Sequence, residues 1–154
     1  MFAIPAVRTS TATLLEKELV EGRSCGTCTA CCKTHMVSEI RKPAGKWCVH
    51  CSVGSGCAIY DARPGNCRAF RCEWLKGFGE EHERPDRTKI VLDFVKRPDG
   101  PRDGIFQIWE SSEGALENPF ARRMTNFALD FGVFASHLYL SGRRRLFAPS
   151  RAAL

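Results

Sequence analysis

Residues 24–35 read SCGTCTACCKTH, which places four cysteines within eight residues and a histidine three positions after the last of them. A stretch this dense in thiols forms disulfides, holds a metal or carries redox chemistry. It offers almost no apolar side chain to bury, so a hydrophobic core cannot order it. What the thiols do therefore decides how this part of the chain folds.

The cysteines extend to residue 72 and stop there. A closed disulfide framework uses an even number, whereas repeated C-x-x-C spacing is typical of metal sites. The first twenty residues, MFAIPAVRTSTATLLEKELV, lack the basic and apolar regions of a secretion signal. We therefore expect a cytoplasmic protein in which reduced thiols bind metal. The nine candidate ligands are Cys25, Cys28, Cys31, Cys32, Cys48, Cys51, Cys57, Cys67 and Cys72.

The chain divides into three segments that we expect to form one compact domain, because its 154 residues are 44% hydrophobic and 26% charged. Residues 1–23 form an N-terminal helical arm, with a helix predicted at 11–21. Residues 24–80 form the cysteine-cluster metal-binding module, whose weak apolar periodicity leaves its folding energy to the metal. Residues 81–154 form an α+β unit. No run of about 18 apolar residues spans a membrane.

The α+β unit has clear periodicity. Residues 89–95 and 105–110 are rich in β-branched and aromatic residues and predict two strands joined by a turn. Residues 118–131 predict a helix capped by Asn118, with Pro119 in its first position. Residues 133–148 predict a closing hairpin. The predicted fold class is α+β, an irregular metal-held module joined to a unit of short antiparallel strands and one amphipathic helix. The apolar face of that helix comprises Phe120, Met124, Phe127 and Phe131.

The first cysteines have the spacing C-x2-C-x2-C, which occurs in zinc sites and at the start of bacterial ferredoxin motifs. The fourth ferredoxin cysteine is replaced here by His35, and the proline after it is absent. Cys31 and Cys32 are adjacent, and adjacent side chains usually point to different sides of the backbone. This pair therefore favours two metal ions, or one ion with the extra thiol beside it.

Residues 47–74 supply the other thiols. Eight of the nine cysteines fill two sites of four thiolates each, and the spacing leaves open which eight these are. His35 and His50 lie beside cysteines and are further candidate ligands. Thiolates suit both zinc and iron. We expect zinc in a structural or carrier role, and the alternative is an iron or iron–sulfur protein with a redox or catalytic role.

The motifs CGTCTACC (25–32) and GCAIYDARPGNCRAF (56–70) resemble the YkgJ-type cysteine-cluster family, whose CxxCxxCC signature marks zinc- or iron-chelating domains. The resemblance spans residues 24 to about 75. It implies framework roles for Tyr60, Arg63, Pro64 and Arg68, and leaves Cys51 and Cys72 outside the family pattern. The ligands that it implies are Cys25, Cys28, Cys31, Cys32, Cys48, Cys57 and Cys67.

The net charge of +6 raises the question of nucleic acid. Residues 25–80 carry eight Lys or Arg against four Asp or Glu, an excess that two thiolate-held zinc ions would cancel. A second candidate anion-binding face comprises Lys89, Lys96, Arg97, Arg143, Arg144 and Arg145. Nucleic acid is not favoured, although a zinc-stabilised module that binds protein or RNA is the second alternative. No Ser–His–Asp pattern or carboxylate pair stands out, which favours a non-enzymatic role with metal ions as partners and no membrane.

Overall fold

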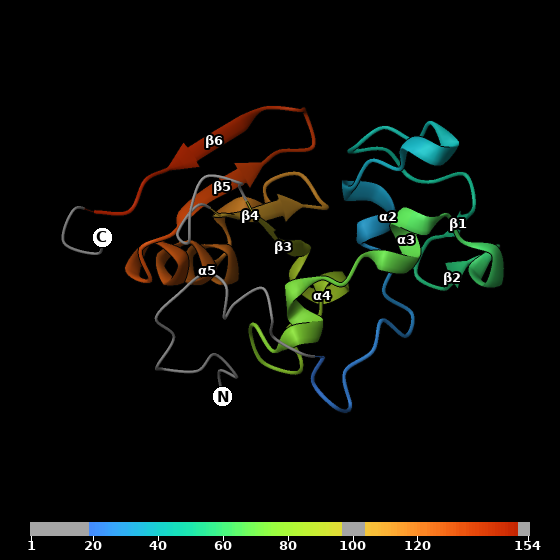
Figure 1. Cartoon of the computed structure of the whole chain (residues 1–154), viewed down its shortest axis with the longest axis horizontal. Helices are drawn as coiled ribbons and strands as arrows, with labels where there is room; N and C mark the ends of the chain where they lie inside the picture. Colours follow the sequence, from blue (N-terminus) through green and yellow to red (C-terminus); the bar gives the residue numbers. More distant parts are fainter. Residues whose placement is uncertain (1–18, 97–103, 151–154) are drawn as a thin grey trace.

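The structure is a computed structural model that describes residues 19–96 and 104–150. Figure 1 shows two parts side by side, a sheet with helix α5 at one end of the molecule and the cysteine-rich segment at the other. The predicted α+β class is confirmed. Of the helix predicted at 11–21, residues 11–18 lie outside the described residues, and residues 19–21 are not helical. Most of the turn predicted after residue 96 also lies outside them.

The larger sheet has the strand order β3-β4-β5-β6. Both predicted strands and the closing hairpin are confirmed, but the sheet is mixed, because β4 and β5 are parallel. The reason is that α5 lies between them in the chain, and such a crossover returns the chain to the end where it began. The strands are β3 (Ile90–Lys96), β4 (Gly104–Glu110), β5 (Phe134–Leu138) and β6 (Arg144–Phe147).

Helix α5 (Pro119–Asp130) begins and ends as its sequence predicts. The Asn118 side chain accepts a hydrogen bond from the Ala121 amide at 2.8 Å. After the helix, Gly132 has a φ of 85°, a left-handed conformation that favours glycine. The amides of Gly132 and Val133 donate to Leu129 and Ala128, which is the Schellman arrangement that closes a helix.

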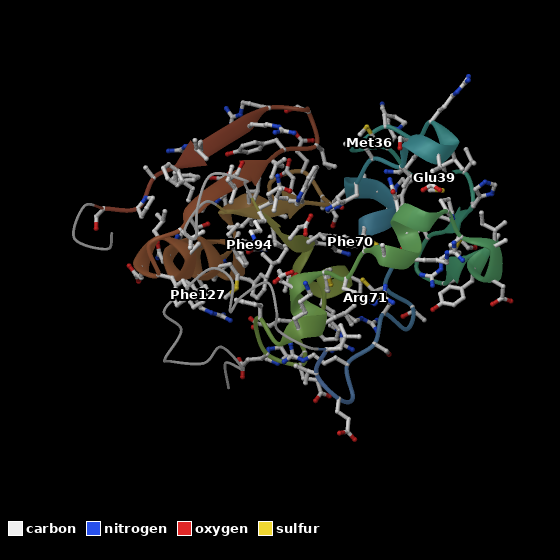
Figure 2. All side chains as sticks on the ribbon, viewed as in Figure 1. Met36, Glu39, Phe70, Arg71, Phe94 and Phe127 are labelled. Carbon is white, nitrogen blue, oxygen red and sulfur yellow. The ribbon has the colours of Figure 1, made fainter. Side chains whose placement is uncertain are left out.

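The main hydrophobic core lies between α5 and one face of this sheet. Phe106 and Ile108 of β4 contribute from the sheet, and Met124 from α5, and all three are almost completely buried. Phe127 is partly buried and packs against Phe78 and Phe106 with ring centroids 5.6 and 6.4 Å apart. Figure 2 shows Phe94 and Phe127 on this side of the molecule. The aromatic residues of the predicted helix therefore build the core.

The cysteine-rich segment consists of short elements and turns, as predicted. Its elements are α2 (Cys31–Thr34), η1 (Ser38–Ile40), β1 (Cys51–Ser52), β2 (Gly56–Cys57), η2 (Tyr60–Ala62), α3 (Gly65–Ala69) and η3 (Glu73–Lys76). Helix α4 (Pro85–Thr88) leads into β3, and η4 (Ala115–Glu117) precedes α5.

A second, smaller apolar cluster joins this segment to the other face of the sheet. Val91 of β3 packs there with Trp74 and Leu75 of η3, and Trp109 of β4 lies against them. Phe78 continues into the main core, where it is fully buried. The division into residues 1–23, 24–80 and 81–154 stays a prediction, and across the second boundary the two parts share apolar contacts.

Candidate metal centre

The nine cysteines separate into two groups. The first thiol group surrounds the buried Cys72, which directly precedes η3. Burial, and then the charges of Cys25 and Cys28, raise the pKa of Cys72 to about 12. Cys28 and Cys31 pack against the apolar cluster that contains Cys72. The first thiol group therefore comprises Cys25, Cys28, Cys31 and Cys72.

The turn that carries Cys25 and Cys28 is held by an arginine from the start of α4. The Arg84 guanidinium donates to both carboxylate oxygens of Asp86, at 2.6 and 2.7 Å, and to Thr27 Oγ1 at 3.0 Å. A Cβ atom at Gly26 would lie 2.8 Å from Arg84 Nη1. Only glycine therefore lets the arginine come this close to the C-x-x-C turn.

The second thiol group lies around Cys32, at the start of α2. Cys32 and Cys51 share a side-chain hydrogen bond, and burial followed by the nearby Cys32 raises the pKa of Cys51 to about 11. Burial, and then Cys32, Cys48 and Cys57, raise the pKa of Cys67. Cys51 and Cys57 are direct partners across the β1–β2 ribbon, so both side chains lie on the same face. The second thiol group comprises Cys32, Cys48, Cys51, Cys57 and Cys67.

Cys31 and Cys32 connect the two groups. Their sulfurs share a hydrogen bond, which together with burial raises the pKa of Cys32. The sequence predicts that these side chains point to different sides, and each does lie with its own group. They remain in contact because they belong to helix α2, where neighbouring residues are about 100° apart rather than opposite one another.

Backbone amides donate hydrogen bonds to three of the sulfurs. Cys28 accepts from Ala30 and Asp86, and Cys72 accepts from Trp74 and Leu75; these bonds oppose the rise in pKa that burial causes. The Cys48 sulfur lies 3.4 Å from the His50 amide nitrogen. In each case one donor is the amide two residues further on. Such donors favour the thiolate, which is the form that binds metal.

Lys42 lies within electrostatic reach of the second thiol group and is only 6% exposed. Its ammonium donates to three backbone carbonyls, those of Lys33, His35 and Pro43. Burial lowers the pKa of Lys42, and nearby thiols oppose that shift: Cys48, Cys32, Cys31 and Cys67. No sequence pattern indicates this position, because Lys33 and Lys46 lie in the same stretch between cysteines.

The donor chemistry of both groups suits a thiophilic metal, although the sulfurs of each group are spread more widely than a bound ion would hold them. A tetrahedral zinc site with Zn–S bonds of about 2.3 Å holds its sulfurs about 3.8 Å apart. In the described residues, which include all nine cysteines, no three sulfurs lie within 4.8 Å of one another. Metal binding therefore requires the thiols of each group to move closer.

One other cluster of ligand-type side chains was missed by sequence reasoning. Glu80, His82 and Glu83 place one ligand atom each within 4.8 Å of the others, and their spacing in EEHE (80–83) was the available signal. Glu83 Oε1 already accepts from Arg123 at 2.7 Å and from the Glu80 amide at 2.8 Å. These hydrogen bonds satisfy the Glu83 carboxylate, so its position needs no bound metal to explain it.

His35 is engaged in contacts other than those of a ligand. Its ring contacts those of Phe70 and Trp109, with centroids 4.5 and 4.4 Å away. Nδ1 lies 2.8 Å from Thr34 Oγ1, and Nε2 lies 3.3 Å from Asp93 Oδ2. Figure 2 shows Phe70 where the two parts of the molecule meet. His35 therefore connects α2 to the sheet. Its ligand role, like that of His50, stays a prediction.

Two of the predicted framework residues lie near the second thiol group. The Arg63 guanidinium stacks on the Tyr60 ring, 3.9 Å from its centroid, and Nε donates to the Tyr60 carbonyl at 3.1 Å. The charge of Arg63 opposes the rise in the pKa of Cys67. Arg63 thus both fixes the turn before Pro64 and acts on a candidate ligand. Arg68 acts on a different group: the amides of Asn66 and Gly65 lower the pKa of Glu39, and the charge of Arg68 contributes less.

The candidate anion-binding face stays a prediction. Lys96 ends β3 and Arg144 begins β6, which are opposite edges of the sheet, and Arg97 lies outside the described residues. Arg143 and Arg145 stack on Tyr139 and Phe147, with guanidinium carbons 4.1 and 4.8 Å from the ring centroids. Charged side chains on an edge strand block pairing with another sheet, which accounts for this run.

No family model, no curated protein and no solved structure matches this chain. In the described part of the chain, none of the helices has both the length and the apolar character needed to cross a bilayer.

Proposed function

We propose that this chain is a metal-binding cysteine-cluster protein that holds about two metal ions, one in each thiol group, with zinc as the metal. In this proposal the first site uses Cys25, Cys28, Cys31 and Cys72. The second site uses four of Cys32, Cys48, Cys51, Cys57 and Cys67. The resemblance to the YkgJ-type family is a proposal that rests on the motif alone.

The observation that carries this proposal is the position of Cys72. It comes 40 residues after Cys32 in the sequence, yet it lies close enough to Cys25 and Cys28 for their charges to raise its pKa. It completes a set of four thiols, the number that structural zinc sites use most. Two amides donate to its sulfur. A cysteine that is buried only for packing needs neither other thiols nearby nor amide donors to its sulfur.

The small number of buried apolar side chains in residues 24–72 supports a structural role for the metal. Of the side chains in this range, few are buried and apolar, among them Ala30, Val37 and Cys72 itself. A bound ion would supply folding energy directly, because the ligands gather around it only in the folded chain. In the first site it would also fix η3, which packs against β3.

The metal would bring chemistry that the thiols alone lack, a tetrahedral cross-link with no redox change for zinc, or electron transfer for an iron–sulfur cluster. We favour zinc because the ferredoxin spacing is incomplete at His35. We also propose that the protein is cytoplasmic, because nine thiols stay reduced in that compartment.

The experiment is anaerobic purification followed by elemental analysis and a visible absorption spectrum. We expect about two zinc ions per chain and no visible absorption. Cys28→Ser and Cys72→Ser should each lose about one ion, whereas the exposed Ser52→Ala serves as a matched control in the same segment and should lose none. Visible absorption together with bound iron would mean that the protein holds an iron–sulfur cluster and not zinc. A folded protein that binds no metal would overturn the proposal.

A further inference from the structure

A buried positive charge, the ammonium of Lys42, lies near the second thiol group. No carboxylate of the described residues offsets this charge through a hydrogen bond. Lys42 is 6% exposed, and its ammonium donates to three backbone carbonyls. Carbonyl oxygens satisfy the ammonium protons but carry no net charge. A buried ammonium normally has an anion nearby, because transfer of an unpaired charge out of water is costly. The groups that favour the charged form of this ammonium most strongly are four thiols.

We propose that Lys42 is the charge-compensating residue of the second metal site, and that its ammonium sets how tightly that site binds a divalent metal. This inference rests on the proposed function and adds a residue that neither the cysteine motif nor its spacing identifies. A divalent ion held by four thiolates carries about two excess negative charges. One buried ammonium beside the sulfurs removes about half of that excess, which makes the loaded site less costly to bury.

The backbone around Lys42 fixes the ammonium in this position. Two of its acceptors, the carbonyls of Lys33 and His35, belong to the last turn of α2 and the residue after it, and α2 carries Cys31 and Cys32. The amide and carbonyl of Val37 pair with those of Lys42 at 2.9 and 3.0 Å. The side chain therefore returns to the helix that carries the ligands. A cation at the C-terminal end of a helix is favourable in its own right.

The two neighbouring lysines provide the contrast. The Lys33 ammonium lies over the Trp47 ring, 5.3 Å from its centroid, and Lys46 is exposed. Removal of either charge leaves the buried ammonium in place. Lys46→Met is therefore a control that changes the net charge of the same loop by the same amount as Lys42→Met.

The test is zinc affinity of the full chain, measured by competition with a chromophoric chelator in wild type, Lys42→Met and Lys46→Met. Substitution of a residue that supports metal ligands without binding the metal typically costs 10- to 100-fold in affinity. We expect Lys42→Met to lower the affinity for one of the two zinc ions by about this factor. Lys46→Met should change neither affinity by more than about twofold. Equal affinities in the two variants would overturn the proposal and leave two-site zinc binding intact. A wild-type chain that binds no zinc would instead remove the proposed function.

If Lys42→Met does not fold even with saturating zinc, Lys42→Arg and Lys42→Gln decide the question. Arginine keeps the charge, whereas glutamine keeps hydrogen-bond donors without it. Recovery of folding and zinc binding by arginine alone supports the proposal. Equal recovery by glutamine overturns it, because the carbonyl hydrogen bonds rather than the charge would then be what matters. Folding is followed by near-ultraviolet circular dichroism in each case.

Discussion

His35 Nε2 lies 3.3 Å from Asp93 Oδ2, and this contact joins the end of α2 to the middle of β3. Both residues are on the sheet face opposite α5, where Trp109 is also found. Through this pair the cysteine-rich segment and the sheet share a polar contact as well as an apolar cluster. Gain or loss of metal in the cysteine-rich segment should therefore alter the stability of β3.

The role of His35 predicts that His35→Ala weakens folding without removing metal. The variant loses two ring contacts, each worth about 0.5–1.5 kcal/mol, so we expect a loss of about 1–3 kcal/mol in the free energy of unfolding. Urea denaturation measures the loss, and elemental analysis should show unchanged metal. If His35→Ala lost as much metal as Cys28→Ser, His35 would be a ligand after all.

Cys72 gives a prediction on which the motif and the geometry disagree. The family motif omits Cys72, which predicts that it matters less than Cys28. Its burial beside Cys25 and Cys28 predicts instead that Cys28→Ser and Cys72→Ser lose similar amounts of metal. Elemental analysis of the two variants purified in parallel decides between these. Full metal in Cys72→Ser would remove this residue from the first site.

The cap of α5 gives a prediction for the sheet half of the molecule. Asn118 Oδ1 accepts from the Ala121 amide, and Nδ2 donates to the Thr88 carbonyl at 2.8 Å. Asn118→Ala should cost about 1–2 kcal/mol in the free energy of unfolding. Asn118→Asp keeps the cap oxygen and loses only the second bond, so its cost should be smaller. An equal cost for both variants in urea denaturation would mean that the cap contributes little.

His137 predicts a pH dependence of stability. It is 8% exposed, and Thr125 Oγ1, 2.8 Å from Nε2, already donates its only hydrogen to the Ala121 carbonyl. Nε2 therefore donates to Thr125. Burial, and then the charge of Arg145, lower the pKa of His137.

Because the pKa in the folded state lies below the unfolded value of about 6.5, the unfolded chain takes up the proton first as the pH falls. The stability is therefore complete above about pH 6.5 and decreases below it. Urea denaturation of wild type and His137→Gln between about pH 7.5 and 5 measures this, and the decrease should be smaller in the variant. Identical slopes would show that His137 does not contribute.

The sheet half could be predicted from sequence because its periodicity is strong. The apolar run of β3 is rich in β-branched and aromatic residues, burial alternates along β4, and the apolar residues of α5 recur at helical spacing. Asn118, Pro119 and Gly132 mark the ends of the helix. The parallel pairing of β4 with β5 was not predicted, since no local pattern distinguishes a crossover from a hairpin over that distance.

The cysteine-rich half could be predicted only in part. The sequence identified the nine candidate thiols, and the adjacent Cys31 and Cys32 favoured a division into two groups. It could not place Cys72 with Cys25, because that depends on how η3 packs against β3. Lys42 could not be found either, because burial alone separates it from Lys33 and Lys46.

Metal removal should affect the two halves differently. A strong chelator should raise hydrogen exchange mainly in residues 24–79, whose order we attribute to metal. Exchange in α5 should change much less, and β3 should show an intermediate change through Val91 and Asp93. A uniform rise along the chain would show that the halves unfold as one unit. Unchanged exchange after proven metal removal would mean that the metal is not structural.

The central claim is that the nine thiols form two metal sites, and native mass spectrometry of the intact chain tests it most directly. The protein would be purified anaerobically and measured before and after acid removal of metal. We predict a mass increase that corresponds to about two zinc ions, with a one-ion species in Cys72→Ser. A native chain whose mass equals that of the bare polypeptide, and which takes up no zinc when zinc is added, would contradict the account.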